Sequence, residues 1–313
     1  MMTTQNPWLF EAPLAHEVAH YANYNIPQLE FEWAALGDLE ATGGTSRHRR
    51  RSAHKAALPL PFFKDSPLLN RVPLASSIVI SRTWPTIRRE LAKTYNRVGG
   101  LIRALAKEVG IDVPSVLAVW HIESGGQPHT VGFAIIRFEN HKFYEHWGKY
   151  NASVYNQHFR FDPNAKWKHH QFRENTSKPF QNVHDGQARE YQALNFAIRL
   201  AGENPALQSI SIGGPQILGE NYRTLGYSSP REMYDAFQHS ERAHVLGFFD
   251  FCLHAPKPRP GDLMRYLHAR QWQKFAKYYN GPGQVTAYAK RFAEAYSQAS
   301  HLTLNQGLSA VTH

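Results

Sequence analysis

The chain has 313 residues, which is enough to bury a sizeable core in one or two domains. Its formal net charge is +10 and its pI is near 9.6, so nucleic acid, anionic membrane surfaces and anionic polysaccharides are all candidate partners. Cys252 is the only cysteine, which excludes an intrachain disulfide and a cysteine-rich zinc site. No apolar run is long enough for a transmembrane helix, so no membrane span is expected.

Residues 1–80 differ in character from the rest of the chain. Aromatic residues are spread among polar ones over the first forty positions, and a basic cluster led by two glycines follows at 43–55. Four prolines between positions 59 and 73 oppose a continuous helix. We therefore expect 1–80 to be a weakly structured leader or targeting segment, 81–300 to be the main domain and 301–313 to be a tail.

From Trp84 onward, apolar residues recur with helical spacing. The pattern predicts a first helix that begins near residue 84 and stops at Gly110. Pro114 suits the first turn of a second helix, at 114–123, whose apolar residues recur at i, i+3, i+4 and i+7. Further helical patterns cover 186–202, 230–254, 262–278 and 284–298.

Strand patterns are few. Residues 133–138 form a short β-favouring run, whereas 150–185 are rich in His, Asn, Lys and aromatic residues with little periodicity. We interpret 150–185 as an extended surface or ligand-facing insertion. The sequence thus predicts a mostly α protein of the α+β class, with a small β element beside the helix at 114–123.

Glu123 is the most informative residue, because it stands at the end of that helix, just before Gly125 and Gly126. It lies seven residues after Val116, and so on the same helical face as the apolar residues. Burial raises the pKa of a glutamate, which then holds a proton near neutral pH and can donate it. Glu123 is therefore a candidate general acid, although a helix-end glutamate whose head reaches water explains the segment alone equally well.

Three other segments carry groups that suit a sugar-binding site. Phe138-Glu139-Asn140-His141 supplies a second carboxylate, and Ser211-Ile-Gly-Gly-Pro-Gln216-Ile-Leu-Gly219 is a glycine-rich turn with one glutamine. Tyr278-Tyr279-Asn280-Gly281 places aromatic and amide groups between two helical patterns. Amide groups both donate and accept hydrogen bonds, as recognition of hydroxyl and N-acetyl groups requires.

The order of these motifs resembles the lysozyme-like N-acetylmuramidase domain of phage endolysins and bacterial cell-wall enzymes. The resemblance covers residues 98–298 and includes the run from Asn221 to Tyr227. It implies a lysozyme-superfamily fold and hydrolysis of the β-1,4 bond between N-acetylmuramic acid and N-acetylglucosamine in peptidoglycan, without a cofactor or metal. Residues 127–132 depart from the pattern, because they lack the Asp-Gly turn that many relatives carry there.

The resemblance also implies roles for individual residues. Glu123 would protonate the leaving oxygen, and Glu139 would activate water or stabilise the oxocarbenium-like transition state. The implied substrate-binding residues are Ser124, Ser211, Gln216, Tyr222, Tyr279 and Asn280. The positive net charge suits this substrate, because peptidoglycan carries peptide carboxylates and lies beside anionic polymers.

Several alternatives remain open from the sequence. A lytic transglycosylase shares most of the motifs, forms 1,6-anhydro products and needs only one carboxylate, so Glu139 discriminates between the two activities. His16-Glu17-Val-Ala-His20 matches the His-Glu-x-x-His pattern of zinc proteases, although little chain precedes it to build a cleft. We expect no nucleic-acid partner, since the basic residues 47–55 belong to no recognisable binding fold. The histidines of 141–184, including His169 and His170, could also bind metal, but their irregular spacing favours a polar insertion.

The location of the protein follows from its first residues and its substrate. These residues lack the basic region and apolar stretch of a secretory signal peptide, so we expect synthesis in the cytoplasm. A cell-wall enzyme without such a signal needs release by lysis or delivery by a phage or secretion system. Residues 1–80 are the candidate contact with a delivery apparatus.

Overall fold

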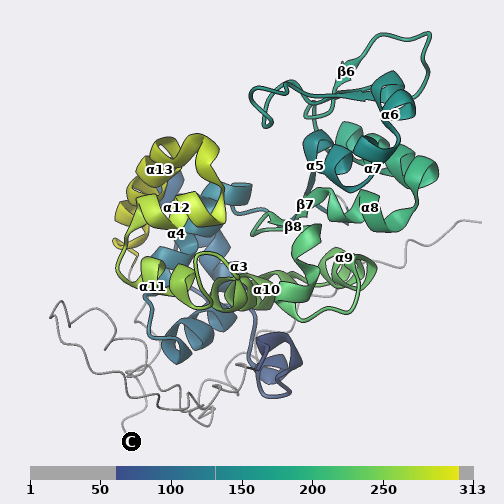
Figure 1. Ribbon diagram of the computed structural model, residues 1–313. Coiled ribbons are helices and arrows are strands. Elements are labelled where there is room, and N and C mark those ends of the chain that lie inside the picture. The colour runs from purple at the N-terminus through teal and green to yellow at the C-terminus, as the bar shows by residue number, and fades with distance from the viewer. Residues whose placement is uncertain (1–60, 131, 303–313) are drawn as a thin grey trace, which may run out of the picture.

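The computed structural model describes residues 61–130 and 132–302, and these residues form two groups of helices with some of the short strands between them (Figure 1). The first long helix, α3, runs from Thr86 to Glu108 and ends at Gly110, whose φ of 69° is the left-handed conformation that glycine tolerates. The following helix, α4, spans Val113–Ser124. The Asp112 side chain accepts a hydrogen bond from Ser115 N and caps it. Both helices confirm the sequence predictions.

Three helices near the C-terminal end of the described chain complete the first group. They are α11 (Asp262–His268), α12 (Trp272–Tyr279) and α13 (Val285–Ala299). Helix α13 packs against α3, α4 and α12, so α4 is enclosed. Every residue from Ser115 to Trp120 is accordingly buried, and the apolar surface of α4 is wider than the single stripe that the spacing predicts.

The second group of helices is α5 (Asn140–His146), α6 (Ala152–His158), α7 (Gln187–Ala201), α8 (Glu203–Gln208) and α9 (Pro230–His239). Helix α10, Glu241–His254, contacts α3 and α11 of the first group and α9 of the second. It is buried from His244 to Leu253, including Cys252, as the sequence predicts for that cysteine. Helix α10 therefore joins the two groups (Figure 1).

The β structure consists of short antiparallel sheets. Strand β7 (Ile210–Ile212) lies between β3 (Ile136–Phe138) and β8 (Ile217–Leu218), and Arg137 pairs with Ser211. Strands β1 (His129–Thr130) and β2 (Phe133–Ala134) form a hairpin. Strands β4 (Phe159–Arg160), β5 (Gln171–Phe172) and β6 (Gln181–Asn182) form a third sheet. The protein is thus mostly helical with a small β element beside α4, which confirms the predicted fold class.

Three segments differ from the sequence prediction. The stretch 230–254 forms two helices because Ser240 has an extended backbone and its side chain caps α10. The stretch 262–278 is also divided, at Arg270, whose φ is 51°. The stretch 150–185 contains α6 and three strands rather than an extended insertion, and Tyr155, Phe159 and Phe172 from it are buried in the core.

Residues 61–80 pack onto the helices. This segment contains two 3-10 helices, η1 (Phe63–Asp65) and η2 (Leu69–Arg71). Phe63 is only 2% exposed, and the Asp250 carboxylate of α10 accepts hydrogen bonds from its backbone N–H at 2.7 Å and from Lys64 N–H at 3.1 Å. Residues 63–69, which lie before the boundary expected at residue 80, therefore contribute to the packed structure.

The two helical groups also meet at a loop. Trp167 lies in the loop between β4 and β5, and its side chain is 42% exposed. A Cβ placed on Gly283, in the 3-10 helix η5 (Pro282–Gln284) before α13, would lie 3.1 Å from the Trp167 ring. The loop of the second group therefore touches the turn that precedes α13.

Some predictions fall outside the described residues. They concern the His16-Glu17-His20 motif, the basic residues 47–55 and most of the tail 301–313. Within residues 61–130 and 132–302, no helix combines the length and the apolar character that crossing a membrane requires.

Candidate active site

The end of α4 determines the position of Glu123. The helix ends at Gly125, and both Gly125 and Gly126 have positive φ values, 62° and 79°. Arg97 of α3 donates a hydrogen bond to the Gly126 carbonyl and thereby anchors this turn. Ser124 Oγ donates to the Trp120 carbonyl at 3.1 Å, so the predicted substrate-binding hydroxyl is engaged with its own helix.

Glu123 is a partly buried carboxyl group with one direct hydrogen-bond donor, Asn280, whose Nδ2 lies 2.7 Å from Oε1. Burial raises the pKa of Glu123 to about 7, against the smaller lowering effects of the Asn280 hydrogen bond and of the Arg291 guanidinium. A carboxyl group with this pKa is protonated in a large share of molecules at neutral pH, as a general acid requires.

Asn280 and Tyr279 come from the end of α12. Asn280 is the C-cap residue, and its Oδ1 is buried without a hydrogen-bond partner in the described part of the chain. The Tyr279 hydroxyl donates to the Pro215 carbonyl at 2.7 Å, and its ring stacks on Phe275. Tyr279 thus connects α12 to the glycine-rich turn at 213–219, while Asn280 is the residue that touches Glu123.

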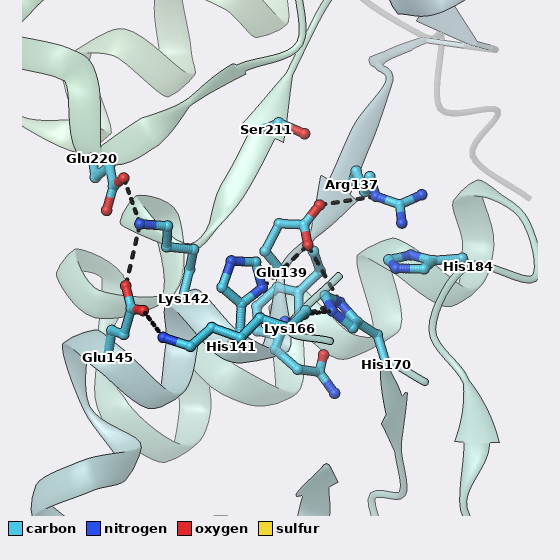
Figure 2. Close-up of polar contacts among 12 residues, drawn as sticks. Arg137, Glu139, His141, Lys142, Glu145, Lys166, His170, His184, Ser211 and Glu220 are labelled. Carbon is cyan, nitrogen blue, oxygen red and sulfur yellow. Dashed lines mark hydrogen bonds and ion pairs between the residues drawn. The ribbon is translucent and has the colours of Figure 1, made fainter. Parts of the chain in front are cut away.

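Glu139 stands between β3 and α5, where three side chains surround its carboxylate (Figure 2). Arg137 Nε donates to Oε1 at 2.8 Å. On the other side, Oε2 lies 3.3 Å from His170 Nδ1 and 3.5 Å from His141 Nδ1. The Glu139 side chain is only 13% exposed, so these contacts occur largely out of water.

One residue connects the surroundings of the two carboxylates. Tyr288 of α13 has a raised pKa, mainly because the phenol is buried and further because the negative charges of Glu123 and Glu139 both act on it. The charges of Glu123 and Glu139 therefore both act on Tyr288, although the two glutamates come from different groups of helices.

The glycine-rich turn and strand β7 place Ser211 and Gln216 near Arg137. Ser211 is the cross-strand neighbour of Arg137, and its hydroxyl donates to Gln216 Oε1 at 3.1 Å. Gln216 Nε2 donates to the Gly213 carbonyl at 2.8 Å, and its backbone φ is 50°. The amide of Gln216 is therefore fixed in orientation, with one amide hydrogen and one acceptor position still available to a ligand.

Two further contacts define this part of the structure. Gly214 allows the turn to approach α4 closely, since a Cβ there would lie 2.3 Å from the Trp120 ring. The hydroxyl of Tyr222, in the 3-10 helix η4 (Gly219–Leu225), accepts a hydrogen bond from Arg223 Nε at 2.8 Å. The structure therefore ties the glycine-rich turn to the catalytic helix candidate, while Tyr222 is engaged with its neighbour in the chain.

A buried acid supports β3 from behind. Glu190 of α7 accepts a hydrogen bond from Phe138 N–H at 2.7 Å, and its other oxygen lies 2.8 Å from His184 Nδ1. Burial raises the pKa of Glu190. The His184 ring in turn lies 4.9 Å from the His170 ring. These contacts hold Glu139 and His170 in place through the backbone and through ring packing.

Sequence reasoning missed Arg137, His170, Tyr288 and Arg291 as parts of this region. Arg137 had a usable signal, because residues two apart in an extended segment lie on the same side, as Arg137 and Glu139 do. His170 lies thirty residues beyond Asn140, whose N–H it meets, and reaches Glu139 through the folding of β4 and β5. No local pattern reports such a contact.

Glu139, His141 and His170 are the described residues with the donor atoms that a metal site needs, since their ligand atoms lie within 4.8 Å of one another. Burial lowers the pKa of His141 to about 4 and also lowers that of His170. The described residues thus include a carboxyl group with a raised pKa, Glu123, and a second carboxyl group that is paired with Arg137, Glu139.

The sequence was compared with known proteins. The family model for N-acetylmuramidases (Muramidase) matches residues 112–300. A search of curated proteins gave no match. Among solved structures, the chain is similar to the crystal structure of the Burkholderia AP3 phage endolysin, with 25% identity and a TM-score of 0.48, over 64% of this chain and 70% of that one.

The family match covers more than half of the chain and contains Glu123, Glu139, the glycine-rich turn and Asn280. This protein therefore belongs to the N-acetylmuramidase family, the glycoside hydrolases whose substrate is peptidoglycan.

Proposed function

We propose that this hydrolase cleaves the β-1,4 bond between N-acetylmuramic acid and N-acetylglucosamine, with Glu123 as the general acid. The observation that carries the proposal is the pKa of Glu123, which burial raises to about 7 while Asn280 holds Oε1 at 2.7 Å. In the first step, the protonated carboxyl group donates its proton to the leaving glycosidic oxygen as the bond to the anomeric carbon breaks.

Glu139 is the second carboxylate in this proposal. Arg137 holds one oxygen, which leaves Oε2 to accept a proton from water or to stabilise positive charge on the sugar ring. The water attacks the anomeric carbon, and its proton passes to the carboxylate that acts as the base.

The remaining predicted residues receive supporting roles. We assign Gln216 to recognition of sugar hydroxyl or N-acetyl groups, with Ser211 orienting its amide. Asn280 positions Glu123, and Tyr279 connects α12 to the glycine-rich turn. Ser124 supports the end of α4, and Tyr222 supports η4 through Arg223.

Digestion of purified peptidoglycan by the wild type, Glu123→Gln and Glu139→Gln, followed by mass spectrometry of the products, tests this function. We expect the digestion rate of Glu123→Gln to be at least about a thousandfold lower than that of the wild type, and that of Glu139→Gln at least about a hundredfold lower. These factors are in the range by which removal of a general acid or base slows a reaction. Glu294→Gln, a change at an exposed position of α13, serves as the control and should keep full activity. Full activity in Glu123→Gln would overturn the proposal, and products that are exclusively anhydro-muramic would show a transglycosylase.

We also propose that the segment 1–60 serves delivery of the enzyme to the cell wall. The support is its distinct composition and its position outside the residues that the family model matches. Deletion of residues 1–60 should leave digestion of purified peptidoglycan unchanged, because these residues lie outside the range that the family model matches. The same deletion should abolish lysis when the enzyme is produced together with its native delivery system. Unchanged lysis in that assay would refute the delivery role.

A further inference from the structure

Glu139, His141 and His170 form a cluster that general acid catalysis does not explain (Figure 2). We propose that these three residues bind a divalent transition-metal cation of the zinc class, and that the bound cation inhibits the hydrolase by occupying Glu139 Oε2. The site lies at the proposed second carboxylate, so its effect on activity rests on the proposed function, whereas cation binding does not.

The distances within the cluster suit a metal better than hydrogen bonds. Glu139 Oε2 lies 3.3 Å from His170 Nδ1 and 3.5 Å from His141 Nδ1, longer than a strong charge-assisted hydrogen bond. Ligand atoms at about 2.0–2.1 Å from a tetrahedral ion are roughly 3.4 Å from each other. Both distances from the carboxylate oxygen therefore match two edges of such a coordination shell.

The tautomer of the neutral His170 ring leaves a lone pair on Nδ1 that can bind a cation. His170 Nε2 lies 2.7 Å from the Lys166 carbonyl, which can only accept, so Nε2 carries the hydrogen. In the neutral ring, Nδ1 then has a lone pair, which points toward the carboxylate oxygen of Glu139 and meets only the Asn140 N–H, at 3.4 Å. A carbonyl on the distal nitrogen is also how metal-bound histidines are oriented in proteins.

His141 contributes a second nitrogen. Its Nδ1 is buried and has no hydrogen-bond partner among the described residues, and a buried polar atom without a partner is costly. The His141 and His170 rings lie 5.5 Å apart at 61°, so both can face the same point from different directions. A cation between them satisfies both nitrogens and the carboxylate.

The basic residues around the cluster are engaged elsewhere. Lys142 Nζ lies 2.8 Å from Glu220 and 3.2 Å from Glu145, and Lys166 Nζ lies 3.1 Å from Glu145. These ammonium groups therefore do not occupy the space between Glu139 and the histidines (Figure 2). Arg137 binds Oε1 of Glu139 and orients the carboxylate so that Oε2 faces the two rings.

The donor set selects the class of metal. Two imidazole nitrogens and one carboxylate suit zinc, cobalt, nickel or copper, whereas magnesium and calcium prefer a shell made of oxygen atoms. Three protein ligands leave a fourth position for water. Glu139 and His141 are 13% and 17% exposed, so neither side chain is completely enclosed by the described residues.

Isothermal titration of the full-length protein, freed of metal by a chelator, with zinc chloride tests the site. We expect the wild type to bind zinc and not magnesium. The zinc affinity of His141→Gln and of His170→Gln should be lower than that of the wild type by a factor of more than about a hundred, since loss of an outer-shell partner alone lowers metal affinity by up to about a hundredfold. His146→Gln, on the same helix as His141 but paired with Glu220, is the matched control and should bind zinc as the wild type does. The double variant His16→Gln and His20→Gln should also keep this binding, which separates the cluster from the His-Glu-x-x-His motif.

Two results would overturn the site. One is wild-type zinc affinity in both His141→Gln and His170→Gln, and the other is equal loss of affinity in His146→Gln. His170 is fully buried, so thermal melting monitored by circular dichroism must accompany each titration. His141 is partly exposed, and a folded His141→Gln protein keeps the test decisive if His170→Gln does not fold.

Inhibition is measured as the ratio of peptidoglycan digestion rates with and without zinc. We expect zinc to lower the wild-type rate at least about tenfold, a chelator to restore it, and the ratio in His141→Gln to be close to one. Zinc binding without inhibition would refute the regulatory part. The metal-free rate of Glu139→Gln, measured separately, decides whether Glu139 is catalytic at all, so failure of the inhibition and failure of the proposed function are distinguishable.

Discussion

At the scale of single residues, Glu123 combines a favourable role in catalysis with a cost to folding. Its pKa of about 7 arises because burial disfavours the charged form more than Asn280 and Arg291 favour it. General acid catalysis needs the protonated form of Glu123, whereas above pH 7 the folded protein must hold the charged carboxylate of Glu123 in a partly buried position. Activity and stability therefore make opposite demands at this position.

This conflict predicts that Glu123→Gln stabilises the protein at alkaline pH. Since the pKa rises from 4.5 in the unfolded chain to about 7 in the folded one, the unfolded chain binds fewer protons in that interval and the free energy of unfolding falls as pH rises. The wild type thereby loses about 3 kcal/mol of its free energy of unfolding by the time the pH is above 7, and glutamine at this position avoids that loss. Urea unfolding should give nearly equal free energies of unfolding for Glu123→Gln and the wild type at pH 4. At pH 8 the variant should be the more stable of the two. Glu294→Gln, at an exposed position, should change neither value, and equal stability of Glu123→Gln at both pH values would contradict the argument.

The sequence predicted Glu123 and Glu139 as candidates but not the side chains around them. Glu123 was visible because a helix pattern, a glycine stop and the carboxylate coincide within a dozen residues. The partners of Glu139 depend on chain reversal, since His170 arrives from a strand of only two residues. Strands of this length carry no alternation that a sequence pattern can reveal.

At the scale of elements, residues 61–80 function as part of the helical core. Phe63 is only 2% exposed and packs against α10, where the centroids of the Phe63 and Phe249 rings are 6.4 Å apart in an edge-to-face arrangement. The Asp250 carboxylate accepts hydrogen bonds from the N–H groups of Phe63 and Lys64 at the start of η1, and burial raises the pKa of Asp250 to about 7. The segment contributes apolar contact and satisfies a buried acid.

Phe63→Ala should therefore lower the free energy of unfolding by about 3–5 kcal/mol, because it leaves a cavity against α10. Leu68→Ala is the matched control from the same segment, since Leu68 is 40% exposed and should cost no more than about 0.5 kcal/mol. Urea unfolding of both variants measures the difference. Equal small losses would show that the segment contributes nothing to the core.

The prediction of elements succeeded where apolar spacing was long and failed where a single residue interrupts it. Helices α3, α4, α7 and α13 lie within a few residues of the predicted ranges. The breaks at Ser240 and Arg270 were missed, because apolar residues continue on both sides while one residue leaves the helical conformation. The region 150–185 was read as extended because its buried aromatic residues, among them Phe159 and Phe172, stand in short elements.

At the scale of the whole molecule, the formal net charge of +10 suits an anionic substrate. Near physiological salt, attraction between this charge and anionic peptidoglycan extends over about 8 Å. It raises the rate of encounter with the wall without altering the chemistry at Glu123.

Binding to peptidoglycan should accordingly weaken with ionic strength. Between about 0.05 M and about 0.5 M sodium chloride we expect the bound fraction to fall, corresponding to a roughly tenfold change in affinity, because screening shortens the reach of the charges. A pelleting assay with inactive Glu123→Gln measures binding without digestion. Peptidoglycan with amidated peptide carboxylates is the control and should show a much smaller dependence. Equal salt dependence of both substrates would exclude charge attraction to the peptides.

The loop between β4 and β5 contacts both groups of helices, because Trp167 packs against Gly283 and His170, at the end of the loop, lies 3.3 Å from Glu139. The turn before α13 and the Glu139 carboxylate, which lie far apart in the sequence, are thus linked by four consecutive residues, 167–170.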